Sequence, residues 1–277
     1  MTFSLVTLVK GRYQQLNNLL EAVSDSTRIP QEIIVVKMDD EAWQAPSNLN
    51  LHINVLKMSE QGLPLAKARN KGMAAATQEN VVFLDIDCIC SQTLFETLLS
   101  ALSAQVVVSA RARYLSHLPN HGNYARLFDK SVAHPKQQAL PGNTAVCYKH
   151  FWSLVFAIRK TIFRRVGGFD EAFCGYGAED TDFARRFDSA AISLIFIDDD
   201  ILHQYHTKYS PPVNYTEDIC ANANLFKQKH GFFPMYGWLK TFEKMGLVAF
   251  SYDEEQVNFM RNATTKEKQA CLSTSPY

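Results

Sequence analysis

The chain has 277 residues, of which 47% are hydrophobic and 20% are charged, so it can bury a large core and is not a disordered tail. Its 28 basic and 28 acidic side chains leave no net charge to attract a polyanion, and no basic run is interleaved with aromatic residues, so we expect no nucleic-acid partner. The six cysteines are scattered and no secretion signal precedes them, which favours reduced thiols over a disulfide framework.

Short β-branched runs alternate with amphipathic stretches along the first hundred residues. We expect helices over residues 13–23, 65–77 and 91–102, and strands over residues 3–9, 32–36, 51–56, 81–85 and 105–110. This alternation is typical of βαβ units, so it predicts an α/β fold with a mainly parallel central sheet flanked by helices. The first apolar run is too short to cross a membrane and no basic segment precedes it, which favours a cytoplasmic protein.

Charged residues occur at or just after the ends of three of the expected strands, within residues 10–12, 38–40 and 85–87. These positions matter because ligands of open α/β sheets bind beyond the carboxyl ends of the strands. Asp85 and Asp87 follow a buried apolar run, and they would face the same side if that strand continued. Carboxylates at a strand end suit a hard divalent cation that keeps open positions for phosphate oxygens, so we predict a metal site here.

The middle of the chain, residues 114–145, shows no sustained periodicity and predicts a long loop of the lid or binding kind. Its histidines, His117, His121 and His134, match no metal-ligand spacing, so we interpret them as solvated loop residues. Residues 151–171 then predict a strand, a short helix and a turn. Because no internal repeat or linker is present, the sequence predicts a single domain.

The segment GGFDEAFCGYGAEDTDFARR, residues 167–186, places three carboxylates behind two glycines. Glu179, Asp180 and Asp182 follow Gly175 and Gly177. One interpretation is a helix start, because acidic side chains are favoured beside the unpaired N–H groups of a first turn. The other is a catalytic site that follows a hinge. The segment alone is compatible with both.

The last part, residues 211–277, predicts two short helices divided by Gly231 and Pro234. We expect its apolar side chains to pack on the main domain, and the alternative is that some of them contact a ligand or a membrane surface. These side chains are Leu225, Phe226, Phe232, Phe233, Trp238, Leu239 and Phe242.

In this order, the segments VVFLDID, FAIRKTIFRRVGGFDEAF, GYGAEDTDFARR and ILHQ resemble those of nucleotide-sugar glycosyltransferases of the GT-A fold. The resemblance is to family 2 and to its β-1,4-galactosyltransferase and chondroitin-polymerase relatives, and it covers roughly residues 3–210. It implies a GT-A (Rossmann-like) fold and one glycosyltransferase domain over residues 1–277. The implied parts are a nucleotide-binding half (1–110), an acceptor and catalytic half (111–210) and a helical C-terminal segment (211–277).

The activity implied by the resemblance is an inverting, metal-dependent transfer of a sugar from a nucleotide donor, with UDP as the expected nucleotide and Mn²⁺ or Mg²⁺ as the cofactor. The implied acceptor is a glycan or a lipid-linked glycan, the latter with peripheral membrane contact, and the implied process is polysaccharide biosynthesis. The resemblance leaves the sugar and the linkage open.

For the metal site, the resemblance assigns Asp87 to the cation that bridges the diphosphate, and Asp85 to the ribose side of the nucleotide. The family completes this site with a histidine some two dozen residues after its E-D pair. His203 in ILHQ matches that position, with His206 as a competitor. The alternative is that neither histidine is a ligand.

For the nucleotide, LVKGR looks like the family's binding loop after the first strand, so Lys10 and Arg12 are expected near the uridine and phosphates. LAKARNKG resembles the helix whose arginine, here Arg69, reaches the nucleotide. Asp39 matches the uracil-contacting acid less closely, because VVKMDD departs from the usual V-V-D-D pattern. The alternative for the three basic residues is that they are solvated surface charges.

For catalysis, the resemblance assigns Asp180 as the base that takes the acceptor proton and Glu179 as the acid that holds sugar hydroxyls. Tyr176 stands where relatives place a Trp against the sugars, and its alternative is a core aromatic role. Asp after Glu favours inversion, because retaining relatives tend to carry Asn there. We expect a helix N-terminus to lower the pKa of Asp180, and Asp182 to be a cap or a helix-surface residue.

Two other classes of protein stay open at this point. A metal-dependent nucleotidyltransferase also uses carboxylates at a sheet edge, but it should carry a Gly- and Lys-rich loop where LVKGRYQQ has one glycine. A non-catalytic sugar-nucleotide-binding protein would have lost site residues. Those of this chain are intact: Asp85, Asp87, Asp180 and His203.

Overall fold

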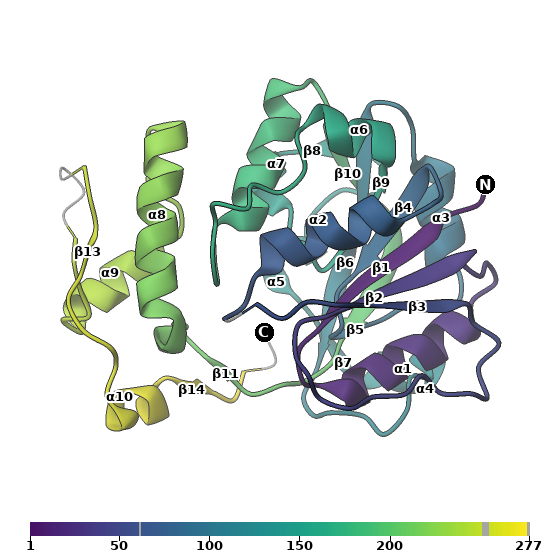
Figure 1. Ribbon diagram of the computed structural model, residues 1–277, viewed down its shortest axis with the longest axis horizontal. Helices are drawn as coiled ribbons and strands as arrows, with labels where there is room; N and C mark the ends of the chain where they lie inside the picture. Colours follow the sequence, from purple (N-terminus) through teal and green to yellow (C-terminus); the bar gives the residue numbers. More distant parts are fainter. Residues whose placement is uncertain (61, 251–254, 276–277) are drawn as a thin grey trace.

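A computed structural model describes residues 1–60, 62–250 and 255–275 (Figure 1). A central sheet with helices on both faces forms the main body. The elements from Lys208 onward, which we call the C-terminal module, lie to one side of it, with α8, α9 and α10 in yellow and green at the left of the view.

The central sheet contains ten strands of the described ranges, in the order β3-β2-β1-β4-β9-β6-β10-β5, with β7 added to β6 and β8 added to β10. Their bounds are β1 (Ser4–Val9), β2 (Glu32–Lys37), β3 (Ile53–Lys57), β4 (Asn80–Leu84), β5 (Cys88–Ile89), β6 (Val106–Leu115), β7 (Ser131–Ala133), β8 (Ala145–Val146), β9 (Val155–Arg159) and β10 (Ser193–His203).

The helices of the main body are α1 (Tyr13–Ser24), α2 (Leu65–Ala75), α3 (Leu94–Ala101), α4 (Tyr124–Leu127), α5 (Pro135–Gln138), α6 (Lys160–Arg165) and α7 (Glu179–Ser189), with the 3₁₀ turns η1 (Phe128–Lys130) and η2 (Tyr148–His150). The expected strand and helix alternation of the first hundred residues is therefore present. The segment 114–145 is not one continuous loop, because β7, β8, α4 and α5 divide it into short elements.

The sheet changes character across its width. Strands β3, β2, β1 and β4 are all parallel, as the alternation predicts. Beyond them β9 lies antiparallel between β4 and β6, while β6 and β10 are again parallel to each other. The sheet is thus parallel in its first half and mixed in its second, because β9 enters the gap between β4 and β6 from the opposite direction.

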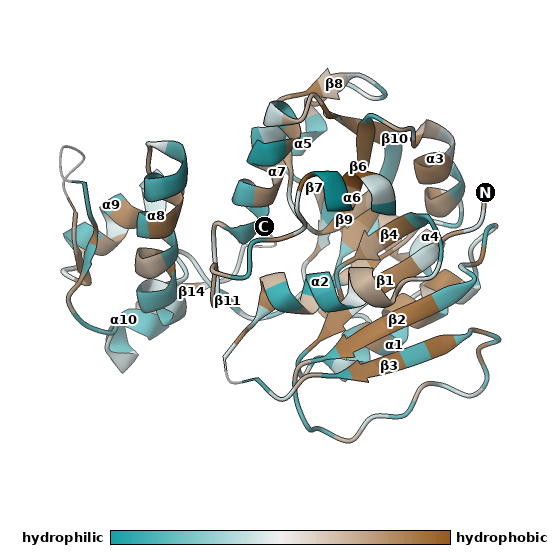
Figure 2. Ribbon diagram, turned by 45° about the horizontal axis from the view of Figure 1, so that its top comes forward, coloured by the Kyte–Doolittle hydropathy of each residue, from teal (hydrophilic) through white to brown (hydrophobic). Residues whose placement is uncertain are grey.

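Alternating side chains of the strands build a core on each face of the sheet. In β1, Leu5 and Val9 join the apolar cluster that α1 and α3 cover. Val6 and Leu8 point to the other face and join the cluster that α2, α6 and α7 cover. In Figure 2 strands β1, β2 and β4 are mostly hydrophobic, whereas helices α2 and α7 carry hydrophilic stretches. Because helices cover both faces of the sheet, a ligand can bind at the ends of the strands.

The C-terminal module has its own apolar cluster, and in the described residues it contains a third helix and short strands besides the two helices that the sequence predicts. It contains β11 (Lys208–Tyr209), η3 (Val213–Tyr215), α8 (Thr216–His230), α9 (Tyr236–Lys244), β12 (Val248–Ala249), β13 (Asn258–Phe259), α10 (Thr265–Ala270) and β14 (Leu272–Ser273). Gly231 and Pro234 do separate two helices, and β14 pairs with β11. Residues 251–254 and 276–277 of the expected helical segment lie outside the described residues. Within the described ranges, every helix is too short or too polar to cross a membrane.

Candidate active site

Asp85 and Asp87 lie at the carboxyl end of β4, where the sequence predicts a metal site. The strand ends at Leu84, and the two aspartates occupy a turn before β5, so the condition for a shared face, that the strand continues through them, is not met. The turn is closed by a hydrogen bond from the N–H of Cys88 to the carbonyl oxygen of Asp85, 2.9 Å. It points Asp87 toward the end of β10, the strand that pairs with β5.

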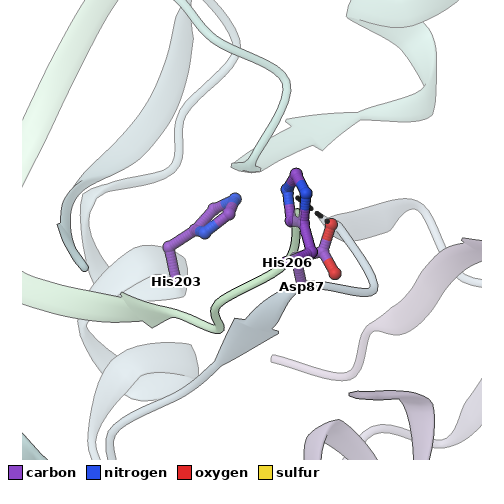
Figure 3. A group of neighbouring side chains, drawn as sticks. All are labelled: Asp87, His203 and His206. Atoms are coloured by element: carbon purple, nitrogen blue, oxygen red, sulfur yellow. Dashed lines mark ion pairs between the residues drawn. The ribbon is translucent and has the colours of Figure 1, made fainter. Parts of the chain in front are cut away.

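Asp87, His203 and His206 form a group whose ligand atoms all lie within 4.8 Å of one another (Figure 3). The Nε2 of His206 is 3.5 Å from the Oδ2 of Asp87, and the ring of His203 stacks on Tyr114 at 4.8 Å between centroids. The Oδ1 of Asp87 is buried and accepts no hydrogen bond from any described residue. One carboxylate with an unpaired oxygen and two imidazoles is a donor set that fits a divalent transition metal.

Gln204, between the two histidines, ties their segment to the aspartate turn. It is fully buried, and its N–H donates to the carbonyl oxygen of Asp87 at 2.6 Å. Its side-chain amide donates to the carbonyl oxygen of Gln15 at 3.0 Å and accepts from Asn18 at 2.8 Å, so α1 joins the same network. This network fixes both histidines relative to Asp87.

Burial controls the charge of this group. Loss of solvation raises the pKa of both Asp85 and Asp87 to about 6; the charge of Asp87 adds to the rise at Asp85, and Arg12 opposes it at both. Loss of solvation also lowers the pKa of His203 to about 3, with the nearby His206 as the next cause. His203 is therefore neutral at pH 7, the state in which an imidazole can bind a metal.

Lys10 and Arg12 lie in the loop between β1 and α1. Lys10 is exposed and donates to the carbonyl oxygen of Gly62. Arg12, with a φ of 56°, pairs with Asp87 through a side chain that stays 40% exposed. Asp39 holds this loop in place, since its carboxylate accepts from the N–H of Gly11 at 2.6 Å and from the hydroxyl of Tyr13 at 2.5 Å. Whether Asp39 also contacts a base stays a prediction.

Arg69 is buried and pairs with Glu179. Its Nη1 lies 3.0 Å from the Oε1 of Glu179, and its guanidinium packs over the rings of Phe83 and Phe169. Its positive charge opposes the rise in the pKa of Asp85 and of Asp180. Arg69 is therefore not a solvated surface charge, and it connects the aspartate turn with the start of α7.

Asp180 stands in the first turn of α7, as the helix-start interpretation predicts. Ala178, with a φ of 71°, is the N-cap and supplies no side-chain hydrogen bond. The expectation that the helix N-terminus lowers the pKa of Asp180 is wrong, because loss of solvation, and after it the charge of Glu179, raise that pKa to about 6. Asp180 is thus a stronger base than an exposed aspartate and is still mostly ionised at pH 7.

Asp182 is not the surface residue that the sequence suggests. Its side chain is fully buried, and its Oδ1 lies 2.6 Å from the Nζ of Lys229 and 2.9 Å from the Nε2 of His230. Both partners belong to α8, and Arg186 approaches the other oxygen at 2.9 Å. The carboxylate links α7 to the C-terminal module.

Tyr176, at the centre of the GYG sequence, packs against aromatic side chains of the C-terminal module. Its ring stacks on Tyr215 at 4.6 Å between centroids and lies 6.3 Å from the ring of Trp238. Burial raises its pKa, and the charges of Glu179, Asp180 and Asp85 add to the rise, so Tyr176 lies near both carboxylate groups of the site.

The family model for glycosyltransferase like family 2 matches residues 37–217, more than half of the chain. The chain belongs to this glycosyltransferase family. Its domain is a glycosyltransferase domain, and the family match favours this class over a nucleotidyltransferase.

Among named glycosyltransferases, the chain is 25% identical over 224 residues to a validoxylamine A glucosyltransferase of Streptomyces hygroscopicus subsp. limoneus. The match covers 69% of this chain and 49% of that protein. A second such enzyme, from subsp. jinggangensis, is also 25% identical, and 52% of it is covered. The chain spans about half the length of the curated relatives it matches.

Solved glycosyltransferases share the GT-A fold of this chain. The mannosyltransferase PcManGT from Pyrobaculum calidifontis superposes with a TM-score of 0.57 at 15% identity, over 84% of this chain and 65% of that one. S. aureus TarS 1-349 gives a TM-score of 0.54 at 14% identity, over 87% of this chain and 76% of that one. At such low identity the likeness shows the fold alone.

Two residues of the candidate site are not among the sequence predictions. Gln204 was visible only as a neighbour of His203, and nothing in a single sequence shows that it is buried and fully hydrogen-bonded. Lys208 lies five residues after His203, is half-buried, and forms no ion pair with any described residue. Its charge lowers the pKa of both His203 and His206, so it lies close to them. The signal that could have identified Lys208 is a basic residue a few positions after the two histidines.

Proposed function

We propose that this chain is an inverting, metal-dependent glycosyltransferase that moves a sugar from a UDP-sugar to a hydroxyl group of a glycan. The observation that carries the proposal is that Asp87, His203 and His206, a group able to hold a metal ion, lie near Asp180, a half-buried carboxylate in the first turn of α7. Arg69 and Tyr176 each lie within electrostatic range of both Asp85 and Asp180, which supports a single site for nucleotide and acceptor.

Asp180 is the proposed base. It takes the proton of the acceptor hydroxyl as that oxygen forms a bond to C1 of the donor sugar, and the bond from C1 to the diphosphate breaks on the opposite side. A single displacement of this kind inverts C1. The raised pKa of Asp180, about 6, suits this role because a base is most effective when its pKa is near the working pH.

Glu179 and Arg69 have supporting roles in this proposal. The buried pair fixes the direction of Glu179, whose second carboxylate oxygen is then available to accept from a sugar hydroxyl. Lys10, Arg12 and Lys208 supply positive charge around the leaving diphosphate, and Asp85 is the proposed partner of the ribose.

Asp87, His203 and His206 would hold the cation, and a bound cation would neutralise charge that develops on the diphosphate. Manganese is the proposed ion rather than magnesium, because two imidazoles accompany one carboxylate and magnesium prefers oxygen ligands. The mannosyltransferase was solved with GDP-Man and Mn²⁺, and TarS with UDP-GlcNAc, so the nucleotide needs a direct test.

A panel of UDP- and GDP-sugars with Mn²⁺ should identify the donor, because many transferases slowly hydrolyse their donor when no acceptor is present. We expect release of UDP from at least one UDP-sugar and loss of this release when the metal is chelated. The measurement is nucleotide release over time. Release from no donor, or equal release with chelator, would contradict the proposal.

The two histidines should differ in effect. His203→Ala should weaken Mn²⁺-dependent UDP binding by roughly tenfold to a hundredfold, the range for disturbing a metal site, and His206→Ala should weaken it less. His203 lies on β10 and is held neutral, whereas His206 lies beyond the strand and its Nδ1 contacts the carbonyl oxygen of Thr207 at 3.1 Å. Calorimetry of both variants measures the order. The reverse order would make His206 the main ligand.

A further inference from the structure

We propose that helix α8 of the C-terminal module is part of the catalytic centre, in which Asp218 and Asn222 act as positioning residues for the loop 174–178 and for Asp180. The inference rests on the proposed function, because it assigns these residues a role in that reaction. It gives the C-terminal module a role beyond apolar packing.

The loop 174–178 leads into α7, and its backbone conformation needs stabilising contacts from outside the loop. Gly175, Gly177 and Ala178 have φ values of 73°, 100° and 71°. Such left-handed conformations are uncommon and strained for a residue with a Cβ, such as Ala178, and they persist only where the surrounding contacts enforce them. The N-cap of α7 adds no side-chain hydrogen bond. Contacts from outside the loop must therefore hold it.

Two polar side chains of α8 make these contacts. The Oδ2 of Asp218 accepts from the N–H of Tyr176 at 3.2 Å. The side-chain amide of Asn222, which is 3% exposed, donates to the carbonyl oxygen of Cys174 at 2.8 Å and to that of Tyr176 at 3.3 Å. The carboxylate of Asp218 lies so close to Gly175 that a Cβ there would overlap it. Only glycine lets α8 approach the loop this closely.

The same face of α8 continues these contacts for the length of the helix. Asp218, Asn222, Phe226 and His230 are spaced by four residues and so lie on one side of a helix. Phe226 is fully buried in a cluster with Phe173 and Ala178. His230 contacts Asp182, one turn into α7. Helix α8 therefore contacts the segment 173–182 before the loop at Phe173, within the loop at residues 174–178, and after the loop at Asp182.

The consequence is that the position of Asp180 depends on α8. Asp180 lies two residues after Ala178 and two before Asp182, and both of these residues contact α8. A base must stand within hydrogen-bond reach of the acceptor hydroxyl, and a displacement of about 1 Å can cost about a hundredfold in rate.

The first test compares Asn222→Ala with Asn224→Ala. Asn224 lies on another side of the same helix, and its partner, Val257, also belongs to the C-terminal module. The side chain of Asn224 accepts from the N–H of Val257 at 2.7 Å and donates to the carbonyl oxygen of Val257 at 2.8 Å. We expect both variants to lower the melting temperature to a similar extent. Only Asn222→Ala should lower kcat of donor hydrolysis, by about ten- to a hundredfold, with the KM for the donor nearly unchanged. Equal kcat values for the two variants would overturn the inference.

A second pair of variants decides the question if Asn222→Ala does not fold. Asp218→Asn keeps an oxygen that can accept from Tyr176 and should retain kcat, whereas Asp218→Ala should lower it about tenfold. Loss in both or in neither would contradict a positioning role for this hydrogen bond.

Hydrogen exchange separates this inference from the proposed function. The amides of residues 176–182 should exchange faster in Asn222→Ala than in Asn224→Ala, whatever the activity. Unchanged exchange would overturn the positioning role even in an active enzyme. A wild-type protein that hydrolyses no donor would contradict the proposed function, and the exchange result would still decide whether α8 holds the loop.

Discussion

Removal of divalent metal should weaken UDP binding by about 5- to 150-fold, the usual range for coupling between two bound ligands. The physical reason is charge. Asp85 and Asp87 are largely removed from solvent, and a diphosphate that approaches them without a cation is repelled. Titration of UDP by calorimetry, first with Mn²⁺ and then with chelator, measures the effect. Equal affinity in both conditions would remove the metal from the proposed site.

Asp87→Asn tests the same coupling from the protein side. The amide keeps the size of the side chain but gives up the charge that binds a cation, so UDP affinity should become low and insensitive to Mn²⁺. Asp188→Asn is the matched control, because Asp188 is exposed at the far end of α7 and pairs only with Arg185 among the described residues. It should leave the dependence on metal unchanged. A metal dependence that survives in Asp87→Asn would assign the ion to other residues.

The sequence predicts the first half of the fold well, because local periodicity and the rule for ligand positions apply there directly. Strands β1, β2, β3 and β4 are parallel and alternate with helices, and Asp85 and Asp87 lie at a carboxyl end as expected. The direction of β9 was not predictable in this way. Its run of apolar residues is the same whichever way the strand enters the sheet.

Contacts between distant segments explain most of what the sequence does not show. Arg69 and Glu179 are 110 residues apart in sequence, and their ion pair forms only because α2 and α7 cover the same face of the sheet. From the sequence, Asp182 is expected on the surface of its helix. It is buried because α8 covers it, and its partner His230 on α8 is 48 residues away in sequence. The direction of the pKa shift of Asp180 has the same origin, since burial by the whole fold outweighs the local helix N-terminus.

Asp180→Asn should lower turnover by about two to four orders of magnitude, the range that removal of a general base usually costs. The amide keeps the volume and most of the hydrogen bonding of the carboxylate, but it cannot accept the proton. UDP affinity should barely change, because the nucleotide contacts are assigned to other residues. Transfer to acceptor, UDP affinity and melting temperature should be measured on the same preparation, with Asp188→Asn as the control on the same helix.

Melting temperature and turnover, measured together, separate the catalytic role from a capping role. The pKa of Asp180 is raised in the folded protein to about 6 from an ordinary 3.8, so ionised Asp180 opposes folding, and this cost appears as the pH rises from 3.8 through 6. At pH 8, Asp180→Asn removes that cost and should melt at the same temperature as the wild type or higher. A residue that served only as a cap would instead show near wild-type turnover, because Asn caps a helix about as well as Asp. Near wild-type transfer by Asp180→Asn would therefore exclude Asp180 as the base and leave Glu179 as the nearest carboxylate able to replace it.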